Sequence, residues 1–382
     1  MGALDDLGVT VIGAGIAGLA AACALGQRGA RVRVVERAPL LSEVGAGLQL
    51  SPNAMRVIDA LGLSPALDAV SLPCRAVDLR DSSGEPVARL DLGQFRPQGR
   101  FRLVHRPALL KVLERGARAA GAMIVLGHPL DEPPPEAELV VAADGVRGGM
   151  RARLNGAETP FFTRHTAWRA MIPAEDGAEP VAQVFLGPGR HLVSYPLAGG
   201  LRNIVAVVER PDWQDEDWSR PGDPAELRAA FARFGGSVPG WLARVDEVGL
   251  WGLFRHEVAP VWQRGPGPRG PALVLIGDAA HPTLPFLAQG AAMAIEDAGV
   301  LAACLDASPD LGAGLARFQA LRRPRCLRIV AAANANARNY HLRGPTRAVA
   351  HAGLRAITRL APGQLVDRFG WLYDHDPLAA AG

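Results

Sequence analysis

The stretch VTVIGAGIAGLAAACALGQRGARVRVVER, residues 9–37, limits the fold more than any other part of this chain. Residues 8–13 predict a short buried strand, residues 16–28 an alanine-rich helix that ends at Gly29, and residues 31–36 a second strand. A strand–helix–strand unit of this length is typical of a parallel sheet with helices packed on its faces. We therefore expect an α/β fold.

Three glycines in the pattern Gly-x-Gly-x-x-Gly join the first strand to the helix. Gly13 permits a tight turn, Gly15 lets a phosphate approach the backbone, and Gly18 lets the helix pack closely on the strand. Glu36, at the end of the second strand, can accept hydrogen bonds from both ribose hydroxyls. In this context the pattern predicts a dinucleotide site. Because Glu36 would repel the 2′-phosphate of NADP, that cofactor is disfavoured at this site, whereas NAD and FAD both remain possible ligands.

A second stretch, IGDAAHPTLPFLAQGAAMAIEDA at residues 276–298, distinguishes between these two cofactors. The apolar residues 272–276 predict a buried strand, and Asp278 follows it at the carboxyl edge of the same sheet. Asp278 can bind the hydroxyls of a polyol there, and FAD has a ribityl chain whereas NAD has none. The next helix opens on small residues that let a flavin ring lie on the backbone, Gly290, Ala291 and Ala292. Its positive end favours the anionic reduced ring, so these features favour tight, non-covalent FAD.

Length and composition restrict the class of protein. A chain of 382 residues is too long for one compact core and suits two domains. The chain has 41 basic and 38 acidic residues, so its charges nearly cancel and give no reason to expect that it binds nucleic acid. Four cysteines without paired spacing argue against disulfides and a metal site, and fit a reducing cytoplasm. No apolar run approaches the ~20 residues of a membrane span, and the acidic start of the chain is unlike a signal peptide.

The middle of the chain differs from both ends. Six of the seven tryptophans lie between residues 168 and 262. The alternating runs HLVSYPL and NIVAVVE, joined by Gly199 and Gly200, predict an antiparallel hairpin and hence a second, inserted domain. We predict an FAD-binding domain in residues 1–73, 101–158 and 264–310, a substrate domain in residues 74–100 and 159–263, and a helical region in residues 311–382.

Together these features resemble the class A flavoprotein monooxygenases, the single-component FAD-dependent aromatic hydroxylases, and among them the salicylate hydroxylase-like and 3-hydroxybenzoate 6-hydroxylase-like group. The resemblance covers nearly the whole chain. It rests on GAGIAG (13–18), ER (36–37), VGAGLQLSPNA (44–54), VHR (104–106), ADGVRGGMR (143–151), the stretch at 276–298 and WLYDHD (371–376). It implies a Rossmann-like FAD-binding domain of the para-hydroxybenzoate hydroxylase type, with an inserted antiparallel-sheet substrate domain and a C-terminal helical region.

The resemblance also implies roles for individual residues. Asp278 would hold the ribityl chain, Arg106 would contact the pyrophosphate region, and Asp144 belongs to a motif that serves both FAD and NAD(P)H. The cofactor-binding residues that it implies are Gly13, Gly15, Ile16, Ala17, Gly18, Glu36, Arg37, Gly47, Arg106, Asp144, Asp278, Pro285, Gly290, Ala291 and Ala292. The family usually has Ser where this chain has Gly148, and glycine caps a helix there at a small cost.

The predicted hairpin carries the candidate catalytic pair. His191 and Tyr195 are four residues apart, so they share one face of a strand, about 13 Å apart at ~3.3 Å per residue. Removing a phenolic proton makes an aromatic ring richer in electrons, so a general base assists its hydroxylation. The resemblance assigns this role to His191 and a ring-orienting role to Tyr195. It implies a substrate pocket lined by Gln49, His191, Tyr195, Pro285 and Phe286, the last standing where some relatives carry His.

Two further polar residues are predicted to be structural. His281 is expected to close a His-Pro turn beside Asp278. Arg169 in AWRAMIP is expected to form a salt bridge at the domain edge rather than to attract a substrate carboxylate. The same run has only the first Trp of the Trp-x-Trp-x-Ile-Pro pattern of flavin halogenases, which argues against a halogenase.

The resemblance implies an FAD-dependent monooxygenase that uses NAD(P)H and O₂. It would hydroxylate a small aromatic, a phenolic or hydroxy-heteroaromatic acid, by way of a flavin C4a-hydroperoxide. NAD(P)H would bind transiently, because no second nucleotide-binding pattern is found. The alternative is a flavoprotein oxidase or dehydrogenase without oxygen transfer. The sequence leaves open the aromatic, the ring position, NADH versus NADPH, whether carboxylate is lost, and whether the chain forms a homodimer.

Overall fold

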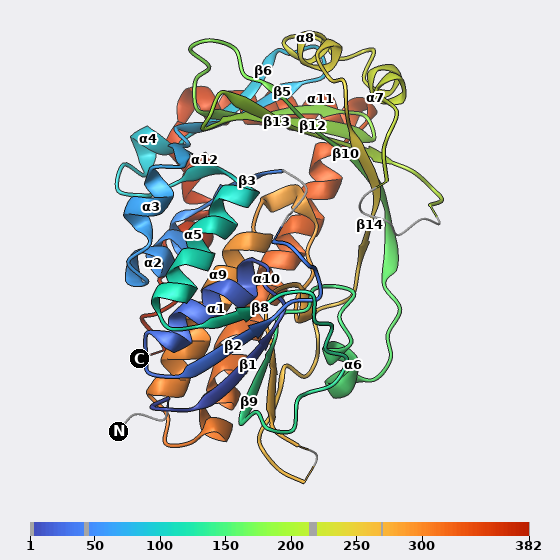
Figure 1. Ribbon diagram of the computed structural model, residues 1–382. Coiled ribbons are helices and arrows are strands. Elements are labelled where there is room, and N and C mark those ends of the chain that lie inside the picture. The colour runs from blue at the N-terminus through green and yellow to red at the C-terminus, as the bar shows by residue number, and fades with distance from the viewer. Residues whose placement is uncertain (1–3, 42–45, 214–219, 269, 382) are drawn as a thin grey trace.

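The computed structural model describes residues 4–41, 46–213, 220–268 and 270–381. Within these residues there are two large sheets, one above the other in Figure 1. The lower sheet has six strands in the order β15-β16-β9-β1-β2-β8, and the upper sheet has seven in the order β14-β10-β13-β12-β11-β5-β6. The chain is thus an α/β protein with a second, mainly antiparallel sheet inserted, as predicted.

The lower sheet is parallel except at one edge. Its strands are β1 (Gly8–Ile12), β2 (Arg31–Val35), β8 (Met123–Val125), β9 (Leu139–Ala142), β16 (Ala272–Leu275) and the antiparallel β15 (Gln263–Arg264). β9 and β16 are buried throughout, which is typical of central parallel strands. β1 and β16 both pair with β9 in parallel. The carboxyl ends of these three strands therefore meet at one edge, so the segments that begin with Gly13, Ala143 and Gly277 leave the sheet side by side.

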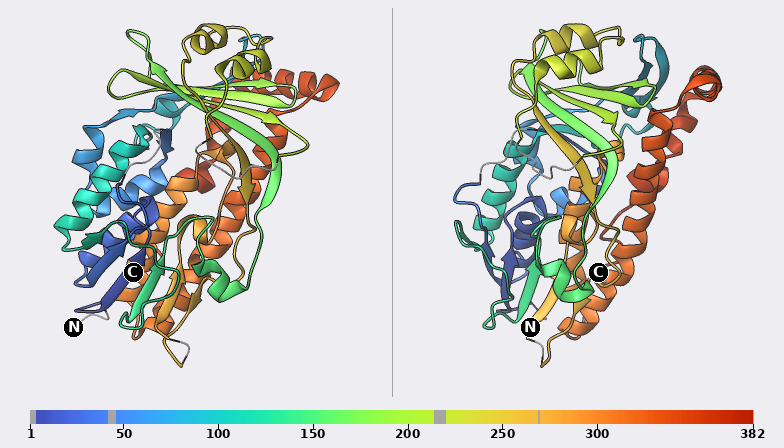
Figure 2. Two further views of the ribbon diagram at one scale, coloured as in Figure 1. Left: turned by 45° about the vertical axis from the view of Figure 1, so that its right-hand side comes forward. Right: turned by 90° about the vertical axis from the view of Figure 1, so that its right-hand side faces the viewer.

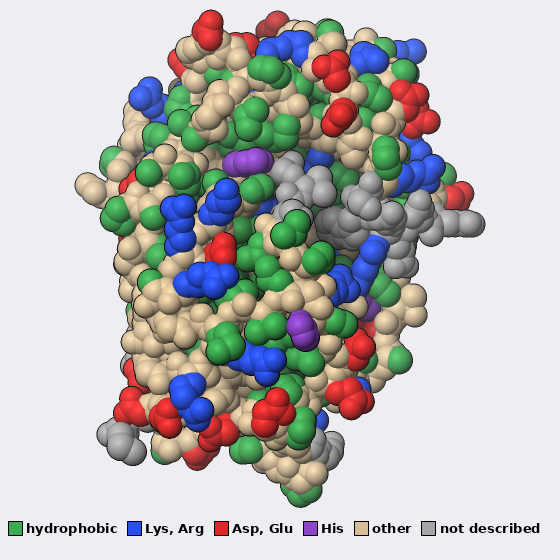
Figure 3. Space-filling model, viewed as in Figure 1, with side chains coloured by type: hydrophobic (Ala, Val, Ile, Leu, Met, Phe, Trp, Pro, Cys, Tyr) green, Lys and Arg blue, Asp and Glu red, His purple; other side chains and the backbone are tan. Residues whose placement is uncertain are grey.

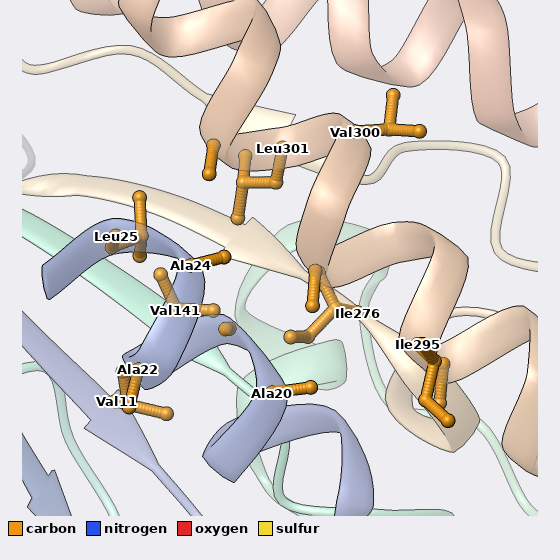
Figure 4. Packing of buried hydrophobic residues seen from close by; sticks show 14 of the residues in the cluster. Val11, Ala20, Ala22, Ala24, Leu25, Val141, Ile276, Ile295, Val300 and Leu301 are labelled. Carbon is orange, nitrogen blue, oxygen red and sulfur yellow. The ribbon is translucent and has the colours of Figure 1, made fainter. Parts of the chain in front are cut away.

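Two alanine-rich helices cover this sheet, α1 (Ile16–Gly26) and α9 (Gly290–Asp306). Nearly every residue of both helices is buried, and the helices pack against each other. Figure 4 shows Ala20 and Ala24 on the side of α1 that faces α9, with Ile276 between the two helices. Small side chains allow this close approach, which holds the first turn of each helix at the carboxyl edge of the sheet. α1 ends slightly earlier than predicted because Gln27 caps it.

The upper sheet combines the middle of the chain with an earlier hairpin. Its strands are β5 (Ala76–Asp81), β6 (Pro86–Asp91), β10 (Phe161–Pro173), β11 (Val181–Gly187), β12 (Arg190–Leu197), β13 (Leu201–Glu209) and β14 (Gly249–Arg255). β12 and β13 form the predicted antiparallel hairpin. β5 and β11 pair in parallel, an arrangement that the local pattern did not indicate because the two strands come from distant segments.

The two faces of the upper sheet have different neighbours. One face, with Trp168, Leu192 and Ile204, packs under α7 (Pro224–Ala230) and α8 (Val238–Ala243). Successive side chains of a strand point to opposite faces, so the intervening residues lie on the other side. We call this other side, which faces the lower sheet in Figure 1, the inner face.

The C-terminal region is helical, as predicted. It consists of α10 (Leu311–Tyr340), α11 (Gly344–Leu360), α12 (Pro362–Asp367) and α13 (Gly370–Tyr373). α10 runs alongside both sheets, as the right-hand view of Figure 2 shows. The residue after its end, His341, contacts the inner face of the upper sheet through His191.

Smaller elements connect the two sheets. A three-stranded sheet of β3 (Gly47–Leu50), β7 (Arg102–His105) and β4 (Ser71–Pro73) contacts the upper sheet. The remaining helices are α2 (Pro52–Ala60), α3 (Ser64–Asp68), α4 (Leu92–Phe95), α5 (Arg106–Ala119) and α6 (Met150–Asn155), with 3₁₀ turns η1 (Gly277–Ala279) and η2 (Pro285–Leu287). In the part of the chain that the structure describes, none of the helices combines the length and apolar character that a membrane crossing requires.

Candidate active site

A cavity of about 300 Å³ lies between the inner face of the upper sheet and the carboxyl edge of the lower sheet. Its wall brings together residues predicted to bind the cofactor and residues predicted to bind the substrate. These are Gly15, Ile16, Ala17, Gly47, Gln49, Arg106, His191, Tyr195, Asp278, Pro285, Gly290 and Ala291. Wall residues that were not predicted as binding residues include Arg169, Val193, Val205 and Trp251. One cavity thus joins the two halves of the predicted site.

The glycine loop after β1 has the shape that a pyrophosphate requires. Gly13 has a φ of +100°, and a side chain there would overlap the carbonyl of Ala143. A side chain on Gly18 would overlap the carbonyl of Gly13, so only glycine lets α1 approach β1 this closely. Gly15 faces open space, with nothing within 4 Å of the position of a Cβ. The amide groups at the start of α1 are therefore accessible to phosphate oxygens.

Glu36 is held beside this loop by two backbone amides. Its carboxylate accepts hydrogen bonds from Ala14 N at 2.8 Å and from Ala38 N at 2.9 Å. A carboxylate offers about four acceptor sites, so about two remain for ribose hydroxyls. Glu36 does not line the cavity itself.

Asp278 points its carboxylate into the cavity. Its side chain is exposed to that space, and it accepts no hydrogen bond from the described residues. Gly277, with a φ of +60°, lies against Ala17 and so sets this turn directly beside α1. Burial raises the pKa of Asp278, while His281 and then Arg106 oppose that rise. A carboxylate enclosed in this way favours a ligand that brings hydroxyl donors.

A buried ion pair network lies behind this turn, and Asp297 is its first centre. Asp297 accepts hydrogen bonds from Gly277 N at 2.9 Å, His281 Nε2 at 2.5 Å and Arg322 Nε at 2.8 Å. Burial lowers the pKa of His281, but Asp297 outweighs it and holds that pKa well above its usual value. His281 is therefore a structural cation that closes the turn, consistent with its predicted role.

Glu296 is the second centre of the same network. It is fully buried and pairs with Arg322 and Arg325. Asn53 donates a hydrogen bond to Glu296 at 2.5 Å and one to Gln289 at 3.1 Å. Burial raises the pKa of Glu296, but Arg322 and Arg325 outweigh this and lower it to about 2. The network thus ties the start of α9 to both α10 and α2.

The inner face presents a compact group of side chains at the other end of the cavity. The pairing register puts Val205 between Val193 and Arg169 in one row across three strands. His191 and Tyr195 lie on either side of Val193 along β12. A planar ring placed over Val193 and Val205 would therefore have His191 and Tyr195 at its two ends and Arg169 at its side.

Arg169 differs from its prediction. It forms no ion pair with a carboxylate of the described residues, so the expected salt bridge at the domain edge is wrong. Its guanidinium lies 4.5 Å from the centroid of the Trp251 ring, and its Nε has no hydrogen-bond partner among the described residues. Burial and the nearby Arg106 lower the pKa of Arg169 to about 10, so it remains a cation at neutral pH. Such a cation on a cavity wall favours an anionic group on the ligand.

Tyr195 is held in place by β3. A Cβ on Gly47 would lie 2.6 Å from the Tyr195 ring, so only glycine fits there. Gly47 N also donates a hydrogen bond to Asn203 Oδ1 at 2.8 Å. Burial raises the pKa of Tyr195, and the opposing effects of Arg169 and Gln49 do not cancel that rise. The phenol therefore stays protonated and can donate a hydrogen bond.

Phe286 does not line this cavity. Its buried ring packs against His191, with ring centroids 5.1 Å apart, and against His165, at 5.4 Å. It borders a neighbouring, mainly apolar cavity of about 560 Å³ instead. The two cavities share Gln49, Val193, Pro285 and Ala288. Phe286 thus packs against His191 from the side of the neighbouring cavity.

The other predicted residues also do not line this cavity. They are Gly13, Gly18, Glu36, Arg37, Asp144 and Ala292. Asp144 Oδ2 accepts a hydrogen bond from Met150 N at 3.0 Å, and its Oδ1 is buried without a partner. The Asp144 carboxyl group fills the space that a Cβ at position 148 would need. Gly148, where the family usually has Ser, therefore gives Asp144 a position that a serine would exclude.

Among the residues that the structure describes, two groups of side chains hold possible metal-ligand atoms within 4.8 Å of one another. One is His281, Asp297 and Cys326, and the other is His165, Glu209 and His341. Asp297 already binds Arg322, and His341 Nδ1 already binds Glu209. We therefore assign no metal to either group.

The surface also favours an anionic ligand. On the face shown in Figure 3, Lys and Arg side chains gather at mid-height, while Asp and Glu lie mainly toward the top and bottom. Among the described residues of the cavity wall, Arg106 and Arg169 are cationic and Asp278 is acidic. A positive potential of this kind attracts phosphates and carboxylates.

Comparison with known proteins is consistent with this geometry. The model of a family described as FAD binding domain matches residues 6–132 and 135–332. A 3-amino-4-hydroxybenzoate 2-monooxygenase of Streptomyces platensis is 34% identical over 389 residues, covering 96% of this chain and 95% of that protein. A 3-hydroxybenzoate 6-hydroxylase of Polaromonas naphthalenivorans is 32% identical over 397 residues, with 96% of each chain covered. A solved salicylate hydroxylase substrate complex superposes with a TM-score of 0.80 at 25% identity, over 99% of this chain and 97% of that one.

Proposed function

Because this chain belongs to the FAD binding domain family of class A aromatic hydroxylases, we propose that its substrate is a small aromatic acid with a ring hydroxyl. The observation that carries this proposal is Arg169, a cation that has no counter-ion among the described residues and lies on the same cavity wall as His191. The names of the two relatives above refer to 3-amino-4-hydroxybenzoate and 3-hydroxybenzoate, each with a carboxylate and a hydroxyl on one ring.

The residues present fit FAD. The open Gly15, the unsatisfied carboxylate of Asp278 and the small residues at the start of α9 match its pyrophosphate, ribityl chain and ring. When bound, FAD supplies the redox chemistry: it accepts electrons from NAD(P)H, a transient co-substrate in this proposal, and activates O₂ toward the aromatic ring. The protein places this reaction between its two sheets.

The inner face supplies the acid–base chemistry and the orientation. His191 accepts the proton of the substrate hydroxyl, directly or through water. Burial, followed by His341 and His165, holds the pKa of His191 well below its usual value, so the ring is neutral and able to accept. Tyr195 donates a hydrogen bond to the same ring, and Arg169 binds its carboxylate.

A panel of phenolic and hydroxypyridine acids tests the function. A substrate should stimulate NAD(P)H oxidation and yield a product that is one oxygen heavier, or hydroxylated with loss of carboxylate. The new oxygen should come from ¹⁸O₂ and not from labelled water. NAD(P)H oxidation or substrate dehydrogenation without incorporation would favour the alternative, an oxidase or dehydrogenase.

FAD retention should depend on Asp278. Asp278→Ala removes a charged acceptor for the ribityl hydroxyls, worth about 1.5–3 kcal/mol, which corresponds to a Kd for FAD raised roughly 10–150-fold. Equilibrium dialysis of the apoprotein with FAD measures this. Asp306→Ala, at the far, exposed end of α9, is the matched control and should bind FAD normally. Equal affinities for the two variants would refute the assignment.

Carboxylate recognition should depend on Arg169. Arg169→Met keeps the length of the side chain but removes a charge-assisted bond of about 1.5–3 kcal/mol, so KM for a phenolic acid should rise roughly 10–150-fold. KM for the matching phenolic amide, which has no charge, should change little. Arg210→Met removes a cation that lies over aromatic rings elsewhere and serves as the control. A KM that rises equally for acid and amide would show that Arg169 only supports the fold.

We also propose a cytoplasmic location. The four cysteines, Cys23, Cys74, Cys304 and Cys326, are all unpaired and buried, which supports a reducing compartment. Fractionation of cells that produce the protein tests this.

A further inference from the structure

Two hydrogen bonds join His191 to the protein surface. His191 Nδ1 lies 2.8 Å from His341 Nε2, and His341 Nδ1 lies 3.0 Å from Glu209 Oε1. His191 and His341 are 2% and 4% exposed, whereas the Glu209 side chain is 39% exposed. This chain of groups therefore begins at the cavity wall and ends in solvent.

Three elements bring these residues together. His191 on β12 pairs with Val207 on β13, and Glu209 follows two residues later, so both polar side chains lie on the inner face. His341 follows the last residue of α10 and lies between them. The turn before β12 secures this arrangement, because Gly189 N donates to the His341 carbonyl at 3.3 Å and Gly189 O accepts from Glu209 N at 2.9 Å.

The network assigns the ring protons. A carboxylate can only accept, so His341 Nδ1 carries a proton and donates to Glu209, which leaves His341 Nε2 as an acceptor. His191 Nδ1 must then donate to His341 Nε2. Burial holds the pKa of both rings below the usual value, to about 4 for His341, so each ring is neutral. His191 Nε2 is left as a free lone pair on a residue that lines the cavity.

We propose that His341 and Glu209 form a proton relay that carries the substrate proton from His191 to solvent. This proposal rests on the proposed function, because it takes His191 as the base. The substrate O–H bond breaks as an N–H bond forms at His191 Nε2. The Nδ1 proton of His191 moves to His341 Nε2, and the Nδ1 proton of His341 moves to Glu209, which releases it to water.

The relay avoids a buried charge. Proton and charge are balanced at each transfer, so His191 and His341 both end neutral and the aromatic oxygen carries the new negative charge. A base without an exit would instead remain an imidazolium among apolar groups, which burial penalises. The reverse sequence, which protonates the oxyanion of the product, restores both tautomers for the next turnover.

Other ionisable groups also face His341. They are His191 on β12, His165 on β10, Glu209 on β13 and Arg343 after α10. The His165 and His341 ring centroids are 5.3 Å apart, but His165 Nδ1 is bonded to the Thr163 carbonyl at 2.7 Å, outside the relay. Arg343 pairs with the other oxygen of Glu209 at the surface.

A coloured phenol tests the relay without turnover. 3-Hydroxy-4-nitrobenzoate has a carboxylate and a phenol whose anion absorbs visible light. It is mixed rapidly with the FAD-loaded enzyme in weak buffer with a pH indicator, so that anion formation and proton release are both followed. His341→Gln and Glu209→Gln should each slow both signals by up to about 10²-fold, the lower end of the usual effect of a general base. Arg343→Gln breaks the surface ion pair but leaves the relay, and should match the unmodified enzyme.

Unchanged kinetics in folded, flavin-loaded His341→Gln would overturn the relay. If that buried variant does not fold, the exposed Glu209→Gln variant decides instead. Unchanged rates of anion formation and proton release in that variant would also contradict the relay. Nitrogen-15 NMR of histidine-labelled protein supplies a test that needs no aromatic ligand. The relay requires His191 and His341 to be neutral with the proton on Nδ1, and a proton on Nε2 of either ring would overturn it. If the nitrophenol does not bind, the proposed substrate class fails while the NMR result still decides the relay.

Discussion

Replacement of His191 by alanine is expected to slow hydroxylation by about 10²–10⁴-fold while FAD remains bound. The reason is geometric: His191 is the only histidine on the wall of the cavity within the described residues. His191 shares this wall with Tyr195 and Arg169, the residues proposed to orient the substrate. Without the base the substrate ring stays protonated and less reactive, so NAD(P)H oxidation should continue while hydrogen peroxide rises and product falls.

The decisive measurement is the rate constant of the hydroxylation step, obtained by rapid mixing of the reduced, flavin-loaded variant with O₂ and substrate. His351→Ala removes another buried histidine that lies away from this cavity, and it should hydroxylate normally. Tyr195→Phe should act more mildly and mainly on substrate affinity, because it removes one orienting hydrogen bond. An unchanged rate constant in a fully flavinated His191→Ala protein would dismiss His191 as the base.

Removal of the central cation of the buried network should have the largest effect on stability. Arg322→Met leaves Glu296 and Asp297 buried with fewer positive partners, and breaking a buried pair typically costs about 3–5 kcal/mol. Arg322 is 1% exposed, so water cannot replace the lost bonds without opening the interface between α9 and α10. FAD affinity should fall as well, because Asp297 holds the turn that carries Asp278.

Denaturant unfolding of the apoprotein, with and without added FAD, measures both effects. Arg323→Met is the matched control, since Arg323 is its neighbour in α10 but is less buried and donates a hydrogen bond to the Ala259 carbonyl. Its free energy of unfolding should fall by roughly 1 kcal/mol, the usual net value of one hydrogen bond. If the two variants were equally stable, the network would not hold α9 to α10 in the way that the structure indicates.

Local features predicted much of the fold. The glycine loop, Glu36 and Asp278 could be predicted because each closely follows a strand of the parallel sheet, and ligands of such sheets bind at the carboxyl ends of the strands. The shared face of His191 and Tyr195 follows from the two-residue repeat of a strand, which any sheet preserves. Helix bounds such as those of α1 shifted only slightly, since end caps depend on single residues.

Other features depend on which segments meet, and only the tertiary structure decided them. Arg169 was predicted to pair with a carboxylate, but Trp251 and Arg106 lie beside it, and it has no carboxylate partner in the part of the chain that the structure describes. His341 and Glu209 are 150 and 18 residues from His191, and no periodicity links such positions. They meet because α10 is long enough to run past both sheets and end at the inner face. The sequence alone thus predicted the cofactor and the residues that each strand or helix contributes to the site. Packing between distant elements decided that Arg169 has no carboxylate partner among the described residues and that His191, His341 and Glu209 are linked by hydrogen bonds.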